Sequence, residues 1–199
     1  MKLLHENEVL HYQQDLTNLK LIRWNELPNF GVYSDQVLTI IESQLSFLSS
    51  DDQERIITPA MINNYVKLGL IERPIKKKYY QLHIAKLIVI TLLKQVLPLT
   101  DVQKGMSLQI SVKGEKVAYD SFCDELEQSF HNLFSCLGKE IDFSFTINQI
   151  RNENIALKMV TLSLASKLLT QKIIEFNGLN QSNTERIYVE EKGAVSFEK

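Results

Sequence analysis

The chain contains few of the residues on which metal centres, redox sites and nucleophilic catalysis depend. Among its 199 residues are two cysteines and four histidines, and none of them has the close spacing of a metal-ligand set. Neither a glycine-rich phosphate loop nor a nucleophile elbow occurs in the sequence. We therefore expect no enzyme activity, no catalytic residue, no metal and no cofactor. Cys123 and Cys136 are too distant along one expected helix to bridge each other, so we expect both to be reduced.

Long hydrophobic runs are missing as well. The longest strongly apolar stretch, residues 87–93, is far shorter than the roughly 20 residues that a membrane-spanning helix needs. Residues 1–6 lack the apolar core of a signal peptide. These absences predict a cytoplasmic protein that does not contact a membrane. An apolar content of 44%, in contrast, is ample for a folded core.

Acidic side chains are scarce in one part of the chain, although the net charge of the whole is only −2. Between residues 54 and 94 there are eight basic and two acidic residues, a local charge of +6, which leaves −8 for the remainder. The densest group is Lys76, Lys77 and Lys78. A compact positive region attracts phosphate, while an acidic remainder discourages indiscriminate adsorption. The alternative at this point is that the three lysines form an ordinary solvated loop.

Residues 58–80 predict a short helix followed by a basic turn. Thr58 is a good N-cap, and Pro59 suits the first helical position because its missing N–H would have no intrahelical partner. Gly69 is typical of the left-handed residue that ends a helix, and Pro74 opposes continuation. The apolar positions are Met61, Ile62, Tyr65, Val66 and Leu68, and the polar face carries Asn63, Asn64 and Lys67.

Hydrophobic periodicity predicts further helices before and after this segment. They cover residues 4–21, a helix capped by Ser34 and extending to about Leu48, then residues 81–97, 116–137 and 147–176. Asp124, Glu125 and Glu127 are interpreted as a solvated helix face, rather than as carboxylates paired with Glu140 and Asp142 for catalysis.

Tyr65, Gly69, Leu70 and Ile71 resemble the Tyr-x-x-x-Gly-Leu-Leu/Ile signature of the mercury-resistance regulator (MerR) family. A longer resemblance runs through residues 33–37, 57–67 and 76–79 with His83, and is to a bacterial domain-of-unknown-function family regarded as transcription regulators. Together they imply a mainly α protein, with a winged helix-turn-helix that has a small wing, followed by a helical C-terminal unit. Asn63 stands where the MerR family usually has arginine, so the resemblance does not transfer an operator preference.

The residue patterns and the resemblance together predict three regions and a function. Residues 1–105 would hold the N-terminal helices and the DNA-binding module, residues 106–177 a helical unit for dimerisation and sensing, and residues 178–199 a flexible tail. We expect a sequence-specific transcription regulator that binds double-stranded DNA as a homodimer, with an unknown effector. An intramolecular helical bundle would bury the same C-terminal apolar surface without a dimer. The competing function is a non-enzymatic protein-interaction adaptor on a winged-helix scaffold.

Each expected DNA contact has an assigned role. Lysine and arginine bind phosphate and position the protein, whereas asparagine can pair bidentately with adenine and read sequence. The expected contact residues are Thr58, Asn63, Asn64, Lys67, Arg73, Lys76, Lys77, Lys78, Tyr79, Tyr80 and His83. The alternatives are that the asparagines are solvated helix-surface residues, that the tyrosines serve packing, and that His83 is structural.

Overall fold

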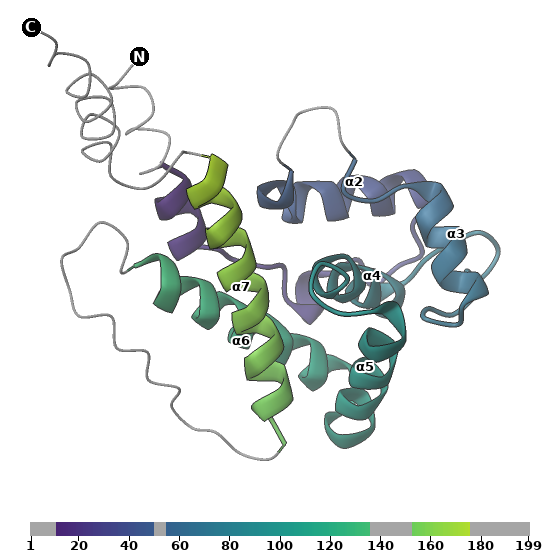
Figure 1. Cartoon of the computed structure of the whole chain (residues 1–199). Helices are drawn as coiled ribbons and strands as arrows, with labels where there is room; N and C mark the ends of the chain where they lie inside the picture. The colour runs from purple at the N-terminus through teal and green to yellow at the C-terminus, as the bar shows by residue number, and fades with distance from the viewer. Residues whose placement is uncertain (1–10, 50–54, 136–152, 176–199) are drawn as a thin grey trace, which may run out of the picture.

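A computed structural model of the chain describes residues 11–49, 55–135 and 153–175 (Figure 1). This described part is mainly helical, as predicted, and no β-strand occurs within it. The helices are α2 (Ser34–Gln44), α3 (Pro59–Lys67), α4 (Gln81–Leu93), α5 (Leu99–Lys113), α6 (Glu115–Phe134) and α7 (Ile155–Glu175), with 3-10 turns η1 (Trp24–Glu26) and η2 (Ser46–Leu48). Residues 11–17 are also helical. In these ranges no helix is both long and apolar enough to cross a membrane.

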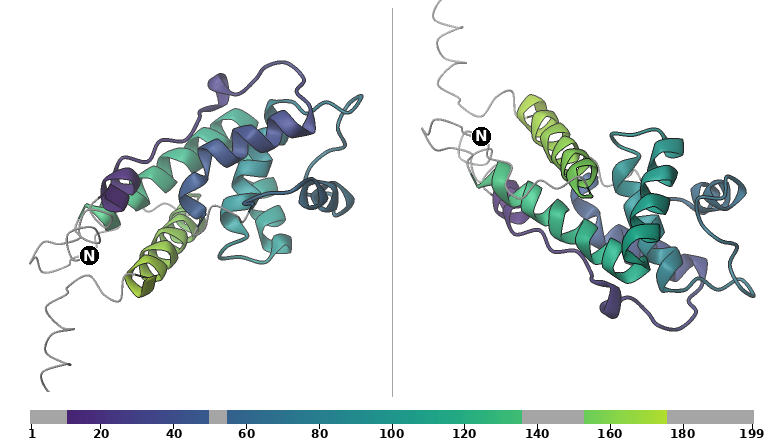
Figure 2. Two further views of the ribbon diagram at one scale, coloured as in Figure 1. Left: turned by 90° about the horizontal axis from the view of Figure 1, so that it is seen from above. Right: turned by 90° about the horizontal axis from the view of Figure 1, so that it is seen from below.

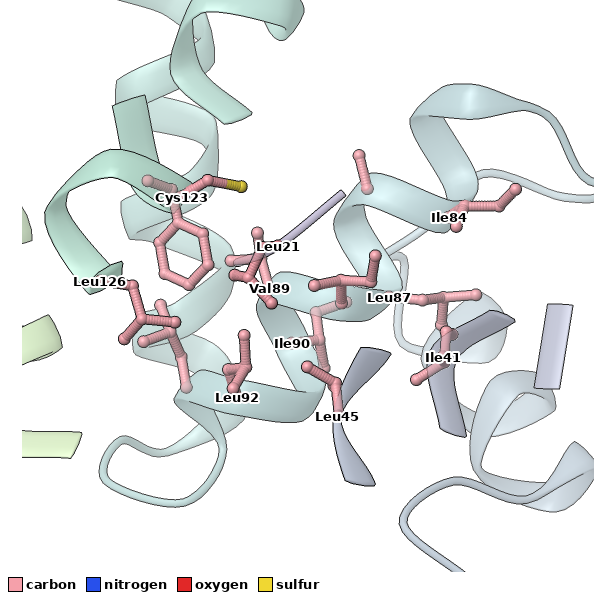
Figure 3. Close-up of a cluster of buried hydrophobic side chains, with 14 of the residues drawn as sticks. Leu21, Ile41, Leu45, Ile84, Leu87, Val89, Ile90, Leu92, Cys123 and Leu126 are labelled. Atoms are coloured by element: carbon pink, nitrogen blue, oxygen red, sulfur yellow. The ribbon is translucent and has the colours of Figure 1, made fainter. Parts of the chain in front are cut away.

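Helix α4 is the centre of the fold. Residues 83–93 are all buried except Lys86, because the helix is apolar on nearly every side and other elements cover it all round. α2 and α5 pack against it, and so do α6 and α7 (Figure 1). Ile41 of α2 and Leu45, which directly follows α2, meet Leu87 and Ile90 of α4 in one cluster that extends to Leu126 of α6 (Figure 3). The described helices therefore share one hydrophobic core.

Among the described helices, α6 and α7 form the most extensive pair. Between them, the hydroxyls of Ser129 and Thr161 lie 3.0 Å apart in a buried hydrogen bond, and Lys158 forms an ion pair of 2.7 Å with Glu125. The views in Figure 2 show this pair at one end of the molecule and α3 at the other. Most of the apolar face of α7 is thus buried within the chain itself.

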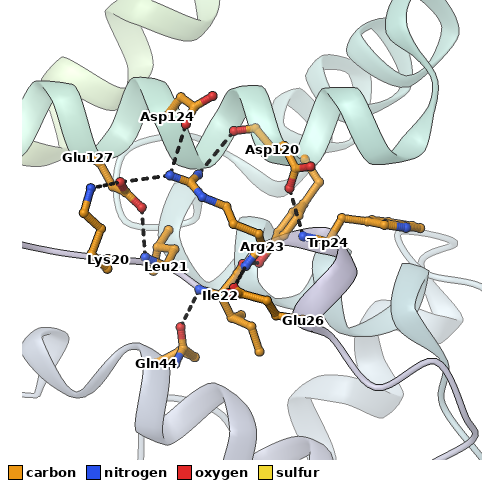
Figure 4. A network of polar contacts seen from close by, with 11 residues as sticks. Lys20, Leu21, Ile22, Arg23, Trp24, Glu26, Gln44, Asp120, Asp124 and Glu127 are labelled. Carbon is orange, nitrogen blue, oxygen red and sulfur yellow. Dashed lines mark hydrogen bonds and ion pairs between the residues drawn. The ribbon is translucent and has the colours of Figure 1, made fainter.

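An extended segment before η1 is fastened to α6 by a polar network (Figure 4). Glu127 accepts from Lys20 Nζ at 2.7 Å and from the backbone N–H of Leu21 at 3.0 Å, and it pairs with Arg23 at 2.9 Å. The Trp24 N–H donates to Asp120 Oδ1 at 2.9 Å. The interpretation of Glu127 as a solvated residue was wrong: the side chain is buried and holds the segment on the core.

Several predicted boundaries differ from those observed. Tyr33 is the N-cap of α2, and its N–H donates to Gln36, so Ser34 is the first helical residue. α4 ends at Leu93, four residues before the predicted end. α5 is a full helix that contains residue 105, so the predicted boundary after residue 105 lies inside it. The predicted tail, Cys136 and the acidic pair at 140 and 142 lie outside the described residues.

Candidate nucleic-acid interface

Helix α3 begins and ends as its sequence predicts. The Thr58 Oγ1 accepts from the Met61 N–H at 3.2 Å, and Pro59 occupies the first turn. Gly69 has a φ of 70°, the left-handed conformation that glycine adopts at low cost. The Gly69 carbonyl accepts from the Gln103 side chain of α5 at 2.9 Å. The start of the helix is thereby capped by its own N-cap residue, and the residue that follows its C-terminal end is joined to α5.

One face of α3 is buried and the other is open to solvent. Ile62 and Tyr65 are 0% and 3% exposed and anchor the helix on the core. Asn63, Asn64 and Lys67 are all exposed. Asn63 and Lys67 are one turn apart and therefore lie on the same side of the helix. The structure thus leaves free the three polar side chains that were predicted to contact DNA from this helix.

The basic segment after α3 forms a tight turn and not a β-hairpin. Ile75 and Lys78 exchange two backbone hydrogen bonds of 2.9 and 3.0 Å, while Lys76 and Lys77 have φ values of 50° and 65°. Positive φ at both central residues is the pattern of a type I′ turn, which favours Asn-Gly over lysine. The predicted wing is therefore not present as paired strands in the described chain. Its place is taken by this turn, named here the 75–78 turn.

The 75–78 turn rests on the segment before α2. Val32 and Tyr79 pair through two backbone hydrogen bonds of 2.9 and 2.8 Å. The Lys78 ammonium lies 5.5 Å from the centre of the Tyr33 ring. A Cβ on Gly31 would come within 2.9 Å of the Lys78 side chain, so glycine permits this close approach. Sequence reasoning assigned no function to Gly31 or Tyr33, because their contact with the turn spans more than 40 residues of chain.

Two predicted contact residues lie in the interior. Tyr79 is 5% exposed and His83 is 6% exposed, and their rings meet edge to face with centroids 5.6 Å apart. His83 Nδ1 accepts from the Tyr80 N–H at 3.1 Å. Burial lowers the pKa of His83, and the nearby Glu72 carboxylate opposes that shift. Tyr79 and His83 are therefore buried packing residues next to the 75–78 turn and are not positioned to touch DNA. Tyr80, in contrast, stays partly exposed.

Comparison with protein families identifies one match, to the domain of unknown function DUF1836, over residues 22–131. The chain belongs to the DUF1836 family. No curated protein and no solved structure matches it. The matched DUF1836 region runs from the segment before η1 into α6 and includes α3 and the 75–78 turn. The family description assigns no activity, so the resemblance to MerR regulators remains a prediction.

Eight basic residues lie between positions 54 and 94 of the DUF1836 region, and they fall into two groups. Lys86 pairs with Glu72, Lys94 donates to the Ile56 carbonyl and Lys78 lies over the Tyr33 ring, so these three are engaged by the protein. The others are exposed and form no ion pair with any described residue: Arg55, Lys67, Arg73, Lys76 and Lys77. These five side chains, named here the free cations, lie on α3 and on the segments directly before and after it. They are available to bind phosphate.

The DUF1836 region shows no arrangement suited to metal or thiol chemistry in the part that the structure describes. No group of three or more histidine, cysteine or carboxylate side chains is placed there to hold a metal ion. Cys123 is fully buried, and burial raises the pKa of its thiol to about 12. A buried, protonated thiol is a poor nucleophile. Cys123 therefore serves packing in α6.

Proposed function

We propose that the chain is a sequence-specific DNA-binding transcription regulator, in which α3 enters the major groove and the 75–78 turn contacts the phosphate backbone. The observation that carries this proposal is the grouping of five free cations around α3, which itself exposes Asn63 and Asn64. Cations on both sides of a helix can fix it on the duplex, while its amides reach base edges. In this proposal α2 and α3 form the helix-turn-helix, and the 75–78 turn is a wing reduced to its tip.

The proposed regulator would bind as a homodimer, since two copies place two recognition helices on the half-sites of a pseudo-palindrome. Pairing with α6 buries much of the apolar surface of α7 on which the dimer was predicted, including Leu164 and Leu168. Ile155 and Ile174 remain 42% and 70% exposed on the same helix. Sedimentation equilibrium tests this part of the proposal separately, because a monomer at every concentration would contradict it.

A salt titration of duplex binding tests the DNA proposal. If all five free cations contact phosphate, the slope of log K against log salt should reach about −4.5. Affinity would then fall roughly 500-fold between about 50 and about 200 mM salt. Replacing Lys76 and Lys77 by glutamine should reduce the slope by about 1.8 on every duplex. Asn63→Ala and Asn64→Ala should instead weaken the preference among sequences while leaving the slope unchanged.

A protein-interaction adaptor is the second candidate, and one observation favours it. Leu68 and Ile75 are 51% and 59% exposed at the same end of the molecule as the free cations, and exposed apolar side chains that gather in one place often mark a protein interface. The two functions differ in one result. Absence of duplex binding even at low salt would exclude the regulator and leave the adaptor.

A further inference from the structure

A cavity lies between α4, α5, α6 and α7, away from the 75–78 turn. Its volume is about 230 Å³. Its wall is largely apolar and takes side chains from all four helices, among them Val89, Leu93, Met106, Phe122, Leu157 and Val160. An engineered apolar cavity of about 150 Å³ is known to bind benzene, so this cavity is large enough for a small organic molecule.

Helix α5 is the least well packed wall of this cavity. Among its 15 residues only Val102 is buried, and Leu108 and Val112 are 58% and 61% exposed. Gly105 also lines the cavity, and a Cβ added there would meet no atom within 4 Å. A molecule in the cavity would therefore supply apolar contacts that α5 lacks in the unliganded chain.

The polar groups of the wall select the charge of the ligand. Lys86 is the one basic residue among those that line the cavity, and it is already paired with Glu72. Asp101 and Glu115 contribute carboxylates, which disfavour a negatively charged molecule. Gln109 has a buried side-chain carbonyl oxygen with no hydrogen-bond partner among the described residues. Because Gln109 lines the cavity, rotation of its side chain would bring this acceptor to an N–H or O–H of a ligand.

We propose that this cavity binds a small, uncharged, mostly apolar molecule that carries a single hydrogen-bond donor. Scaled from benzene in its cavity, the volume accommodates roughly eight or nine non-hydrogen atoms. A substituted phenol has this size and chemistry. The proposal does not depend on DNA binding, because it rests on the cavity wall alone.

Titration of the full chain with p-cresol tests the site. Trp24 is the chain's single tryptophan and lines the cavity, so its fluorescence reports occupancy directly. We expect a saturable change with p-cresol, and slower amide hydrogen exchange in α5 at saturation. p-Xylene, in which a methyl group replaces the hydroxyl, should bind roughly fivefold more weakly because it lacks the donor. Benzoate, which is anionic at neutral pH, should bind more weakly still.

Substitutions that fill the cavity provide the controls. Gly105→Leu and Ala156→Leu place a side chain into the space from α5 and from α7, and each should weaken p-cresol binding at least about tenfold. Ser107→Leu adds the same side chain to an exposed position of α5 outside the wall and should leave binding unchanged. Circular dichroism shows which variants fold. The proposal is overturned if p-cresol does not saturate wild type, if a folded filled variant binds it as wild type does, or if p-xylene or benzoate binds equally well.

Discussion

Replacing Lys76 by asparagine and Lys77 by glycine in the 75–78 turn should stabilise the fold and at the same time weaken DNA binding. Lys76 and Lys77 adopt φ values of 50° and 65°, and left-handed backbone costs an ordinary residue roughly 1–2 kcal/mol. Lys77→Gly removes that cost. Because glycine also makes the unfolded chain more flexible, the net gain in the free energy of unfolding is smaller by about 0.5–1 kcal/mol. Lys76→Asn adds a smaller gain, because asparagine tolerates this conformation. The double variant should therefore be about 1 kcal/mol more stable than wild type.

Urea denaturation measures this gain. For a chain whose free energy of unfolding falls by about 2 kcal/mol per molar urea, the midpoint should rise by about 0.5 M. The same variant removes two free cations, so the salt slope of duplex binding should become about 1.8 less steep. Stability and DNA affinity should thus change in opposite directions.

A matched double variant separates backbone from charge. Lys76→Ala with Lys77→Ala removes both charges but keeps a Cβ at both left-handed positions, so the salt slope should become about 1.8 less steep without a gain in stability. If the Asn-Gly variant is no more stable than the Ala-Ala variant, the assigned cost of the turn is refuted. If both variants bind duplex with the wild-type slope, the turn does not contact phosphate.

Three further substitutions, with Gly105→Ala as a control, test residues that hold the fold around the interface. Gly31→Ala places a Cβ 2.9 Å from the Lys78 side chain, so it should lower the free energy of unfolding by about 1–3 kcal/mol, measured by urea denaturation. Gly105→Ala is the control, because its Cβ would have no atom within 4 Å and should not destabilise the fold. Equal effects of the two substitutions would refute the close approach at Gly31. Glu127→Ala should cost about 2 kcal/mol because it leaves the buried Leu21 N–H without its acceptor, and a loss below about 1 kcal/mol would contradict the anchoring role. Burial depresses the pKa of His83 below 6.5, so protonation favours the unfolded chain and stability should fall as pH drops below about 6.5. His83→Asn should flatten this pH dependence, and an unchanged profile would show that His83 is not its source.

Short-range signals in the sequence predicted α3 correctly. An N-cap needs only the hydroxyl of Thr58 and the N–H three residues later, and a helix end needs only a residue such as Gly69 that accepts positive φ. Both interactions are complete within a few residues of chain. The apolar face of the helix was also predicted from local spacing, because its buried residues Ile62 and Tyr65 were among the predicted apolar positions.

Interactions between distant segments were beyond the reach of sequence patterns. In α5 only Val102 is buried, and the helix also contains Gly105. Its sequence therefore shows little apolar periodicity, although the helix forms. Glu127 looks like part of a solvated acidic face until the fold brings Lys20 and Arg23 against it. His83 precedes the apolar run of α4 and follows the lysines, and only the tertiary structure shows that its ring is buried. The candidate interface was therefore located from sequence, whereas its supporting residues were not.

Site-specific photocrosslinking to duplex DNA tests the central proposal most directly. A photoreactive residue at Asn63 probes the exposed face of α3, one at Lys77 probes the 75–78 turn, and one at Ser163 probes the exposed side of α7. We expect crosslinks to DNA from positions 63 and 77 and none from position 163. Crosslinks from position 163 alone, or none from any position under conditions where the chain binds duplex, would contradict the proposal.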